Sequence, residues 1–250
     1  MVKGMYTAAS GMMLQLAKQD VVANNIANSN TNSFKRQLAV SCAYPTMNIS
    51  RREGSGLKAL QAIGQLGSGA VLGEVSTDFS TGSMMQTGVP TDLALGKDAY
   101  FVVETPQGER FTRCGSFKMN FDGLLSTSQG FPLLDENGEY IFVEPGFTVD
   151  KQGNISANGI TLATLQLVRF ENQDRLLPVG ENLYAAGDDY YMEAEDPQLM
   201  QGFLEQSNVN AVREMVTLLA AVRAYEMLQK VVQAEDELTQ VAVDKVGALE

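Results

Sequence analysis

The stretch from Asn208 to Val246 constrains the fold most, because it runs without a proline or a glycine. Such a stretch can form one long helix. Asn208 or Asn210 can cap its start, and Glu214 then lies in the first turn, where the helix dipole favours a negative charge. Apolar residues recur at three- and four-residue steps, typical of a helix that packs on other helices: Met215, Leu218, Val222, Tyr225, Leu228 and Val232.

The N-terminal stretch from Lys3 to about Asn28 has the same period. Its seam is interrupted by the polar Gln19 and consists of Met5, Ala9, Met12, Leu16, Ala23 and Ile26. An asparagine-rich tract follows, and asparagine can adopt a left-handed conformation or cover bare carbonyl groups. We expect this tract to end the helix at an elbow, with Phe34 as an apolar anchor and with Lys35 and Arg36 facing polar or acidic groups. The predicted elbow residues are Asn24, Asn25, Asn28, Thr31 and Lys35.

The middle of the chain, from about Gly67 to Gly187, has a different pattern. Short apolar runs such as AYFVVE and ATLQLVRF are typical of strands. Dipeptides that favour hairpin turns separate many of these runs, at 122–123, 137–138 and 158–159. We predict an all-β body here, and a looser connecting region from about 37 to 66 with a turn at 51–54.

The fold class is therefore α+β, with long terminal helices that form a coiled-coil-like inner domain, and with a central body of antiparallel strands. The predicted parts are an N-terminal helix with its elbow (1–36), a connector (37–85), the β-domain (86–190), a return segment (191–207) and a C-terminal helix (208–250).

Each terminal helix is too long to lie wholly on a β-body of this size, and leaving its apolar seam in water is costly. The two termini must therefore pair with each other, with other copies, or with both. We expect them to be partly disordered in an isolated chain and to order on association. The seam residues of both helices, together with Phe34, are predicted to lie at subunit interfaces.

Composition excludes several kinds of function. The chain has no histidine, which rules out Ser–His–Asp and Cys–His catalysis and imidazole-bound zinc. A net charge of −12 argues against nucleic acid and against an anionic membrane surface. Cys42 and Cys114 are interpreted as free or buried thiols. We predict no catalytic residue, cofactor or metal site, no membrane-inserted segment and no cleavable signal peptide.

Three segments resemble the bacterial flagellar rod and hook proteins. The N-terminal one is YTAASGMMLQ followed by VVANNIANSNTNSFKR, in which Ser33 replaces the family's usual glycine, so the unusual backbone that glycine allows is not assumed there. The central one begins with DFSTGSMMQTGVPTDLAL. A few residues later, Asp98 to Phe101 replaces the family's glycine-aromatic motif. The C-terminal one is GFLEQSNVNAVREMVTLLAAVRAYE.

The resemblance implies a structural subunit of the flagellar rod, because hook proteins carry larger inserted domains. It implies assembly with itself and with neighbouring rod proteins, export through the flagellar type III apparatus, and a place in the basal body across the periplasm. The segments MVKGMYTAASGMM and YPTMNISRRE are more similar to proximal than to distal rod proteins. Two other classes stay open. A soluble cap or scaffold would share the layout, and a cell-wall hydrolase would need paired carboxylates, of which no spaced pair stands out.

Overall fold

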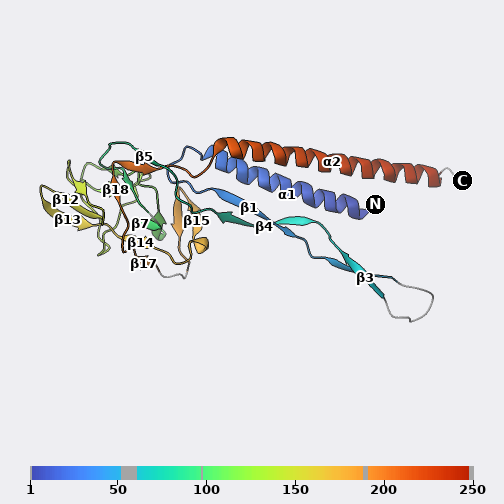
Figure 1. Ribbon diagram of the computed structural model, residues 1–250, viewed down its shortest axis with the longest axis horizontal. Helices are drawn as coiled ribbons and strands as arrows, with labels where there is room; N and C mark the ends of the chain where they lie inside the picture. The colour runs from blue at the N-terminus through green and yellow to red at the C-terminus, as the bar shows by residue number, and fades with distance from the viewer. Residues whose placement is uncertain (1, 52–60, 97, 188–190, 248–250) are drawn as a thin grey trace. The chain divides into compact units, whose positions relative to one another are not determined.

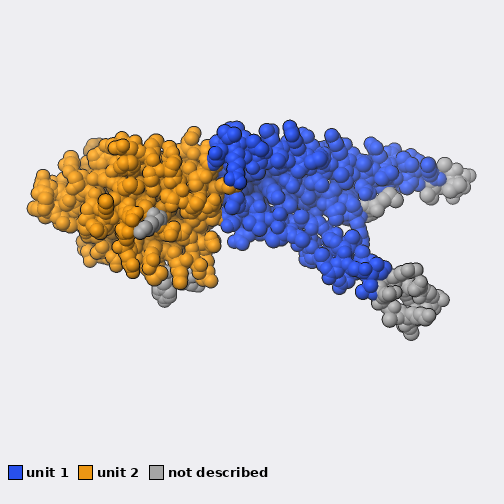
Figure 2. Space-filling model, viewed as in Figure 1, with its two compact units in different colours: residues 1–27, 37–76, 210–250 blue, residues 28–36, 77–209 orange. Residues whose placement is uncertain are grey.

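The computed structural model describes residues 2–51, 61–96, 98–187 and 191–247. It divides into two compact units that alternate along the chain (Figure 2). Unit 1 consists of residues 1–27, 37–76 and 210–250, and unit 2 of residues 28–36 and 77–209. The elbow thus belongs to the same unit as the β-body, whereas the division made from sequence grouped it with the N-terminal helix.

Unit 1 contains both predicted helices, α1 (Val2–Ala27) and α2 (Ala211–Gly247). Asn210 caps α2, because its Oδ1 accepts a hydrogen bond of 3.0 Å from the backbone N–H of Arg213. The two helices lie side by side (Figure 1). Gly11 permits a close approach, since a Cβ at that position would lie 3.0 Å from a methyl carbon of Leu228. The termini therefore pair with each other, one of the two alternatives left open by the sequence, and both helices are formed in the single chain.

The connector of unit 1 is a two-stranded ribbon, not a loose segment as the sequence suggested. In it β1 (Gln37–Ala43) pairs with β4 (Ala70–Thr77), and β2 (Met47–Arg51) pairs antiparallel with β3 (Gln61–Leu66). The strand β1 packs against α1. Of the turn predicted at 51–54, Arg51 ends β2 and residues 52–54 lie outside the described residues.

Unit 2 is the predicted β-body. Its largest sheet has the order β15-β16-β8-β7-β14-β17 and includes the hairpin of β7 and β8. The strands of this sheet are β7 (Ala99–Thr105), β8 (Gly108–Thr112), β14 (Leu167–Arg169), β15 (Leu177–Gly180), β16 (Leu183–Ala185) and β17 (Met192–Glu193). A 3-10 turn, Gln173–Arg175, precedes β15.

Shorter pairings complete unit 2. A three-stranded sheet has the order β11-β12-β13, with β11 (Thr148–Val149), β12 (Asn154–Ala157) and β13 (Ile160–Thr164). The remaining pairs are β5 (Met84–Gln86) with β19 (Phe203–Glu205), β6 (Leu93–Ala94) with β18 (Met200–Gln201), and β9 (Lys118–Met119) with β10 (Leu125–Ser126).

The core of unit 2 lies on both faces of β7, because successive side chains of a strand point in opposite directions. Phe101 and Val103 belong to one apolar cluster, in which the rings of Phe101 and Phe117 meet edge to face at 4.9 Å. Tyr100 and Val102 belong to a second cluster on the other face. A strand buried on both faces explains why AYFVVE is continuously apolar.

The turns predicted in the β-body are present. Gly123, Gly138 and Gly159 have φ angles of 82°, 78° and 80°, in the left-handed region. Asn158 also has a positive φ, of 52°, and with Gly159 it forms the two-residue connection between β12 and β13. Positive φ at both central residues is the geometry that favours Asn-Gly in tight hairpins.

Candidate functional site: the elbow and the helix faces

The elbow, residues 28–36, leaves α1 and packs into unit 2. The backbone N–H of Ser33 donates to the carbonyl oxygen of Glu205 at 2.9 Å, and its Oγ donates to the carbonyl oxygen of Arg113 at 2.8 Å. The side-chain amide of Asn182 donates to the carbonyl oxygen of Asn32 at 2.9 Å. Three distant parts of the β-body therefore hold this segment.

Ser33 is the residue at which the chain turns. Its φ angle is 56°, so a serine adopts the left-handed conformation that the absence of glycine had left in doubt. Along the described backbone from 24 to 36 no asparagine has a positive φ, which corrects the expectation that the asparagine tract supplies this conformation. The hydrogen bond from the buried Ser33 hydroxyl offsets part of the strain, which is about 1 kcal/mol or more for a residue with a Cβ.

A buried charge cluster anchors the elbow. Nζ of Lys35 lies 2.7 Å from Oε1 of Glu205, and Nε of Arg113 lies 3.0 Å from Oε2 of the same carboxylate. The three side chains are at most 2% exposed. Further hydrogen bonds support the site, among them those from the N–H of Gly82 to Glu205 and from Lys35 to the carbonyl oxygen of Ser80. We call Lys35, Arg113 and Glu205 the elbow charge cluster.

The electrostatics of this cluster favour the ionised carboxylate. Burial by itself would raise the pKa of Glu205, but Arg113, Lys35 and the hydrogen bonds hold that pKa below its ordinary value. The pKa of Lys35 is lowered, first by burial and then by the nearby Arg113. A cluster this buried offers no surface to a substrate, so its role is structural. The prediction that Lys35 faces an acidic group is confirmed.

Asn25, predicted as a helix-termination residue, is fully buried in unit 1. Its Oδ1 accepts from the N–H of Gln37 at 2.9 Å, and its Nδ2 donates to the carbonyl oxygen of Gln37 at 2.8 Å. The same Nδ2 lies 3.4 Å from a carboxylate oxygen of Glu214. One side chain thus joins the end of α1 to the starts of β1 and α2.

Asn208, directly after the return segment, likewise joins separate segments of unit 2 through its side chain. Its Oδ1 accepts from the N–H of Arg36, and its Nδ2 donates to the carbonyl oxygen of Asp78, both at 2.8 Å. Sequence reasoning proposed Asn208 only as a possible helix cap. Its true partners are 172 and 130 residues away in the chain, which local patterns do not reveal.

The remaining predicted elbow residues form the turn that follows α1. The N–H of Thr31 donates to the carbonyl oxygen of Asn28 at 3.1 Å, and its Oγ1 lies 3.2 Å from Oδ1 of Asn28. Asn24 is exposed within the last turn of α1, and Phe34 is half-buried in unit 2. Phe34 also accepts a backbone hydrogen bond from Asn208.

The predicted interface seams divide into exposed and half-buried members. On α1, Ala9, Leu16 and Ala23 are exposed, whereas Met5, Met12 and Ile26 are half-buried. On α2, Met215 is exposed at 50%, and the half-buried members are Leu218, Val222, Tyr225, Leu228 and Val232. Leu228 lies against Gly11 of the same chain, so part of the α2 seam serves the contact between the two helices.

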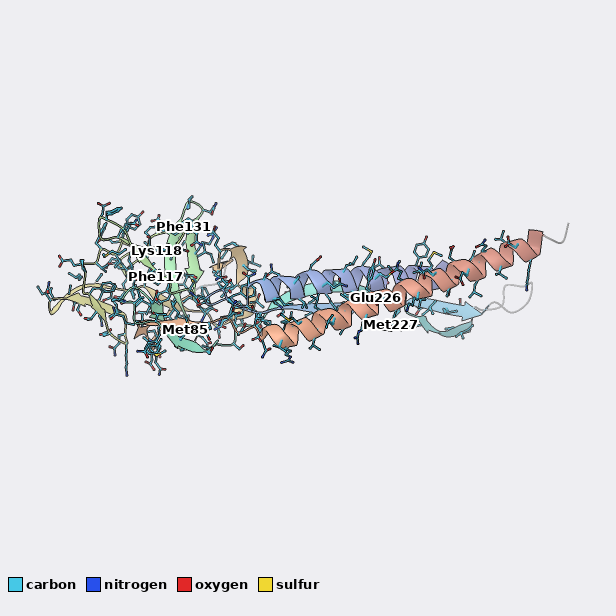
Figure 3. The ribbon with its side chains drawn as sticks, turned by 90° about the horizontal axis from the view of Figure 1, so that it is seen from above. Met85, Phe117, Lys118, Phe131, Glu226 and Met227 are labelled. Carbon is cyan, nitrogen blue, oxygen red and sulfur yellow. The ribbon has the colours of Figure 1, made fainter. Side chains whose placement is uncertain are left out.

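A second apolar stripe on α2 was not recognised in the sequence as a separate surface, and two of its members, Leu238 and Val241, were expected to extend the predicted seam less regularly. All its members are exposed by 46% or more, and they are Val212, Val216, Leu219, Met227, Val231, Leu238 and Val241. Met227 projects midway along α2, beside Glu226 (Figure 3). Two stripes at helical spacing on one helix were the available signal, since a helix with a single partner needs only one. On α1, Tyr6 and Met13 are likewise exposed, at 70% and 71%.

These features define a class of protein: a structural subunit with a locked elbow and with apolar helix faces that the described residues of its own chain leave exposed. Neither helix, over the described residues, has a stretch long and apolar enough to cross a membrane.

Comparison with known proteins gives the family. Residues 5–35 match the family described as flagella basal body rod protein, residues 94–163 the flagellar hook protein FlgE/F/G D1 domain, and residues 200–244 the flagellar basal body rod FlgEFG protein C-terminal family. The flagellar basal-body rod protein FlgF of Caulobacter vibrioides is 33% identical over 100% of both chains.

The rod protein FlgG of Bacillus subtilis is 32% identical over 98% of this chain and 99% of its own, and FlgG of Borreliella burgdorferi is 33% identical over 97% and 98%. The chain therefore belongs to the flagellar basal-body rod protein family and is a structural subunit of the rod, not an enzyme. Its relatives include both FlgF and FlgG at nearly equal identity.

Proposed function

We propose that this subunit associates head-to-tail with copies of itself and with neighbouring rod proteins to build a helical tube. The observation that carries the proposal is the uncovered apolar surface on both helices, which is costly in water and is repaid by association. Non-identical patches that meet head-to-tail generate an open helix when the rotation between copies does not close a ring.

In this tube the terminal helices form a coiled-coil-like inner layer and the β-body forms an outer layer. The connector and the return segment, with the boundaries predicted from the sequence, link the two layers. The elbow is the joint between the layers. Its buried charge cluster and the left-handed Ser33 support this role, because they hold the chain that leaves α1 in one conformation. A joint with a fixed conformation passes twisting force from one layer to the other, which is what a shaft that transmits motor torque requires.

The tube stands in the basal body across the periplasm, and the subunit reaches it through the flagellar type III export apparatus without a cleavable signal peptide. We further propose a proximal position in the rod, which the match to FlgF along both full lengths supports. The FlgG relatives favour a distal position as the second candidate.

Two charge substitutions test the helical interface. Leu16→Asp and Met215→Asp place a carboxylate on exposed positions of the predicted seams, so the single chain should fold normally while incorporation into basal bodies and motility are lost. Gln229→Asp, at an exposed polar position of α2, is the matched control. Met12→Asp and Val222→Asp are less decisive, because both positions are half-buried in the single chain. Normal motility in both exposed variants would refute the assignment.

A further inference from the structure

The ribbon of unit 1 has one apolar face that the described residues of its own chain leave exposed. Alternation along β1 puts Leu38, Val40, Cys42 and Tyr44 on one side, and all four are exposed. Gly73 of β4 lies on the same side, because a Cβ there would collide with the Cys42 sulfur. Val71 and Val75 share that side by alternation. We call this surface the outer ribbon face.

The helix α1 packs against part of the opposite side of the ribbon. Ser10 of α1 accepts a hydrogen bond of 3.4 Å from the N–H of Ala70, and Gly69 lies against the same serine. A two-stranded ribbon is marginal in water unless both strands are supported. Residues 37–51 and 61–76 carry only two charged side chains, Arg51 and Glu74, in a chain of net charge −12. A ribbon meant to remain in solvent is normally protected by charges along it.

We propose that the outer ribbon face is covered by α1 of a second copy, so that each ribbon lies between its own α1 and its neighbour's. This inference rests on the proposed self-assembly and names the contact that drives it. The occupant presents the exposed stripe of α1, on the side away from α2, which consists of Tyr6, Ala9, Met13, Leu16 and Ala23.

Length and area support this pairing. The stripe from Tyr6 to Ala23 is about 26 Å long at 1.5 Å per residue. The outer ribbon face from Leu38 to Tyr44 is about 20 Å long at 3.3 Å per residue, and exposed apolar residues continue beyond it at Met47 and Ile49. The large apolar side chains of both surfaces are exposed by 37% or more, so their contact removes apolar area from water.

Charge distinguishes α1 from α2 as the occupant. Asp20 is the one charged residue on the α1 stripe between Tyr6 and Ala23. The second apolar stripe of α2 includes Arg223 and Lys230 between its apolar members. Burying these cations against a ribbon nearly free of charge would cost more than the apolar contact returns. Because each copy offers one ribbon face and one α1 stripe, the contact can propagate from copy to copy and builds an open helix when the rotation between copies does not close a ring.

Disulfide trapping tests the contact, because the native Cys42 already lies on the outer ribbon face. In a Cys114→Ser background, one cysteine is added to the α1 stripe as Ala9→Cys, Met13→Cys or Leu16→Cys. The concentrated full-length protein is treated with copper phenanthroline, which takes up the two electrons as two thiols form one bond. A disulfide forms only where the two Cα atoms approach to about 4.4–6.8 Å. We expect a ladder of dimers, trimers and longer species from at least one variant.

The matched controls are the background protein and its Val216→Cys and Leu219→Cys derivatives on α2. Ladders from the α2 cysteines alone, or Cys42–Cys42 dimers in the background, would overturn the inference. The inference would also be overturned if a sample that sediments as polymers gave no covalent ladder. That result would leave the proposed function unaffected. A chain that stays monomeric at every concentration contradicts the proposed self-assembly itself.

A charge placed on the ribbon gives a second readout. Val40→Asp should raise the concentration needed for polymerisation at least tenfold, because the carboxylate would be buried against the neighbouring helix. Ser41→Asp, the exposed neighbour on the other side of β1, is the control and should leave that concentration unchanged. Equal behaviour of the two variants would contradict the assigned face.

Discussion

Removing the charge of Glu205 tests the view that the elbow is locked by electrostatics. The substitution Glu205→Gln keeps the shape of the side chain but removes the carboxylate charge that Lys35 and Arg113, both at most 2% exposed, contact. Removing one partner of a buried ion pair lowers the free energy of unfolding by about 3–5 kcal/mol. For a domain of this size each kcal/mol lowers the melting temperature by about 2–4 °C. We therefore expect unit 2 to melt about 10 °C lower.

The assay is urea or thermal unfolding followed by near-ultraviolet circular dichroism. The chain has no tryptophan, so the signal reports tyrosines, among them the buried Tyr100 and Tyr184 of unit 2. Glu144→Gln, at an exposed position, is the matched control and should change stability by less than about 0.5 kcal/mol. A loss below about 1 kcal/mol in Glu205→Gln would refute the reasoning.

The pH dependence of the same variant has a defined sign. The pKa of Glu205 is lower in the folded state than its ordinary value of 4.5, so the carboxylate contributes stability above pH 4.5 that is lost as the pH falls through the folded-state pKa. The stability difference between the parent protein and Glu205→Gln should thus be constant near neutrality and shrink below about pH 4.5. A difference that widens in acid would contradict the assignment of the charge.

Three further substitutions probe neighbouring features by the same unfolding assay. Ser33→Ala loses a buried hydrogen bond and keeps the left-handed strain, so it should cost about 1–3 kcal/mol, whereas Ser33→Gly should cost less because glycine accepts that conformation; the reverse order would count against the strain. Asn25→Asp should melt unit 1, read from helical ellipticity at 222 nm, because it places a second carboxylate beside Glu214 and removes the donor to Gln37; an unchanged helix signal would contradict this. Tyr100→Phe should be neutral or stabilising by up to about 2 kcal/mol, since the buried hydroxyl has no hydrogen-bond partner among the described residues; a clear loss of stability would show that this hydroxyl is satisfied after all.

The sequence predicted those parts of the fold that depend on local patterns. The three- and four-residue steps located both helices, and the Asn-Gly and Asp-Gly dipeptides located turns in the β-body, because each pattern reflects the conformation of a few consecutive residues. The ribbon was missed although Leu38, Val40 and Cys42 alternate with small or polar residues, since its apolar side faces outward instead of packing into a core.

The site was predictable only in part, for the same reason. The basic character of the elbow indicated that Lys35 would meet acidic groups, and it does so at Glu205. The identity of that partner, 170 residues along the chain, is a property of the tertiary fold. The position of Lys35 also decides where an N-terminal deletion can start. A fragment that starts after residue 27 keeps Ser33 and Lys35 with the β-body, whereas one that starts after residue 36 leaves Glu205 and Arg113 without them.

The elbow charge cluster also determines when the β-body can complete its folding. Lys35 emerges early from any process that delivers the chain N-terminus first, but its carboxylate partner arrives only with β19, shortly before the final helix. Until then the β-body is missing both an edge strand beside β5 and the group that neutralises two cations. The β-body of a chain delivered in that direction therefore cannot reach its final form until most of the sequence has arrived.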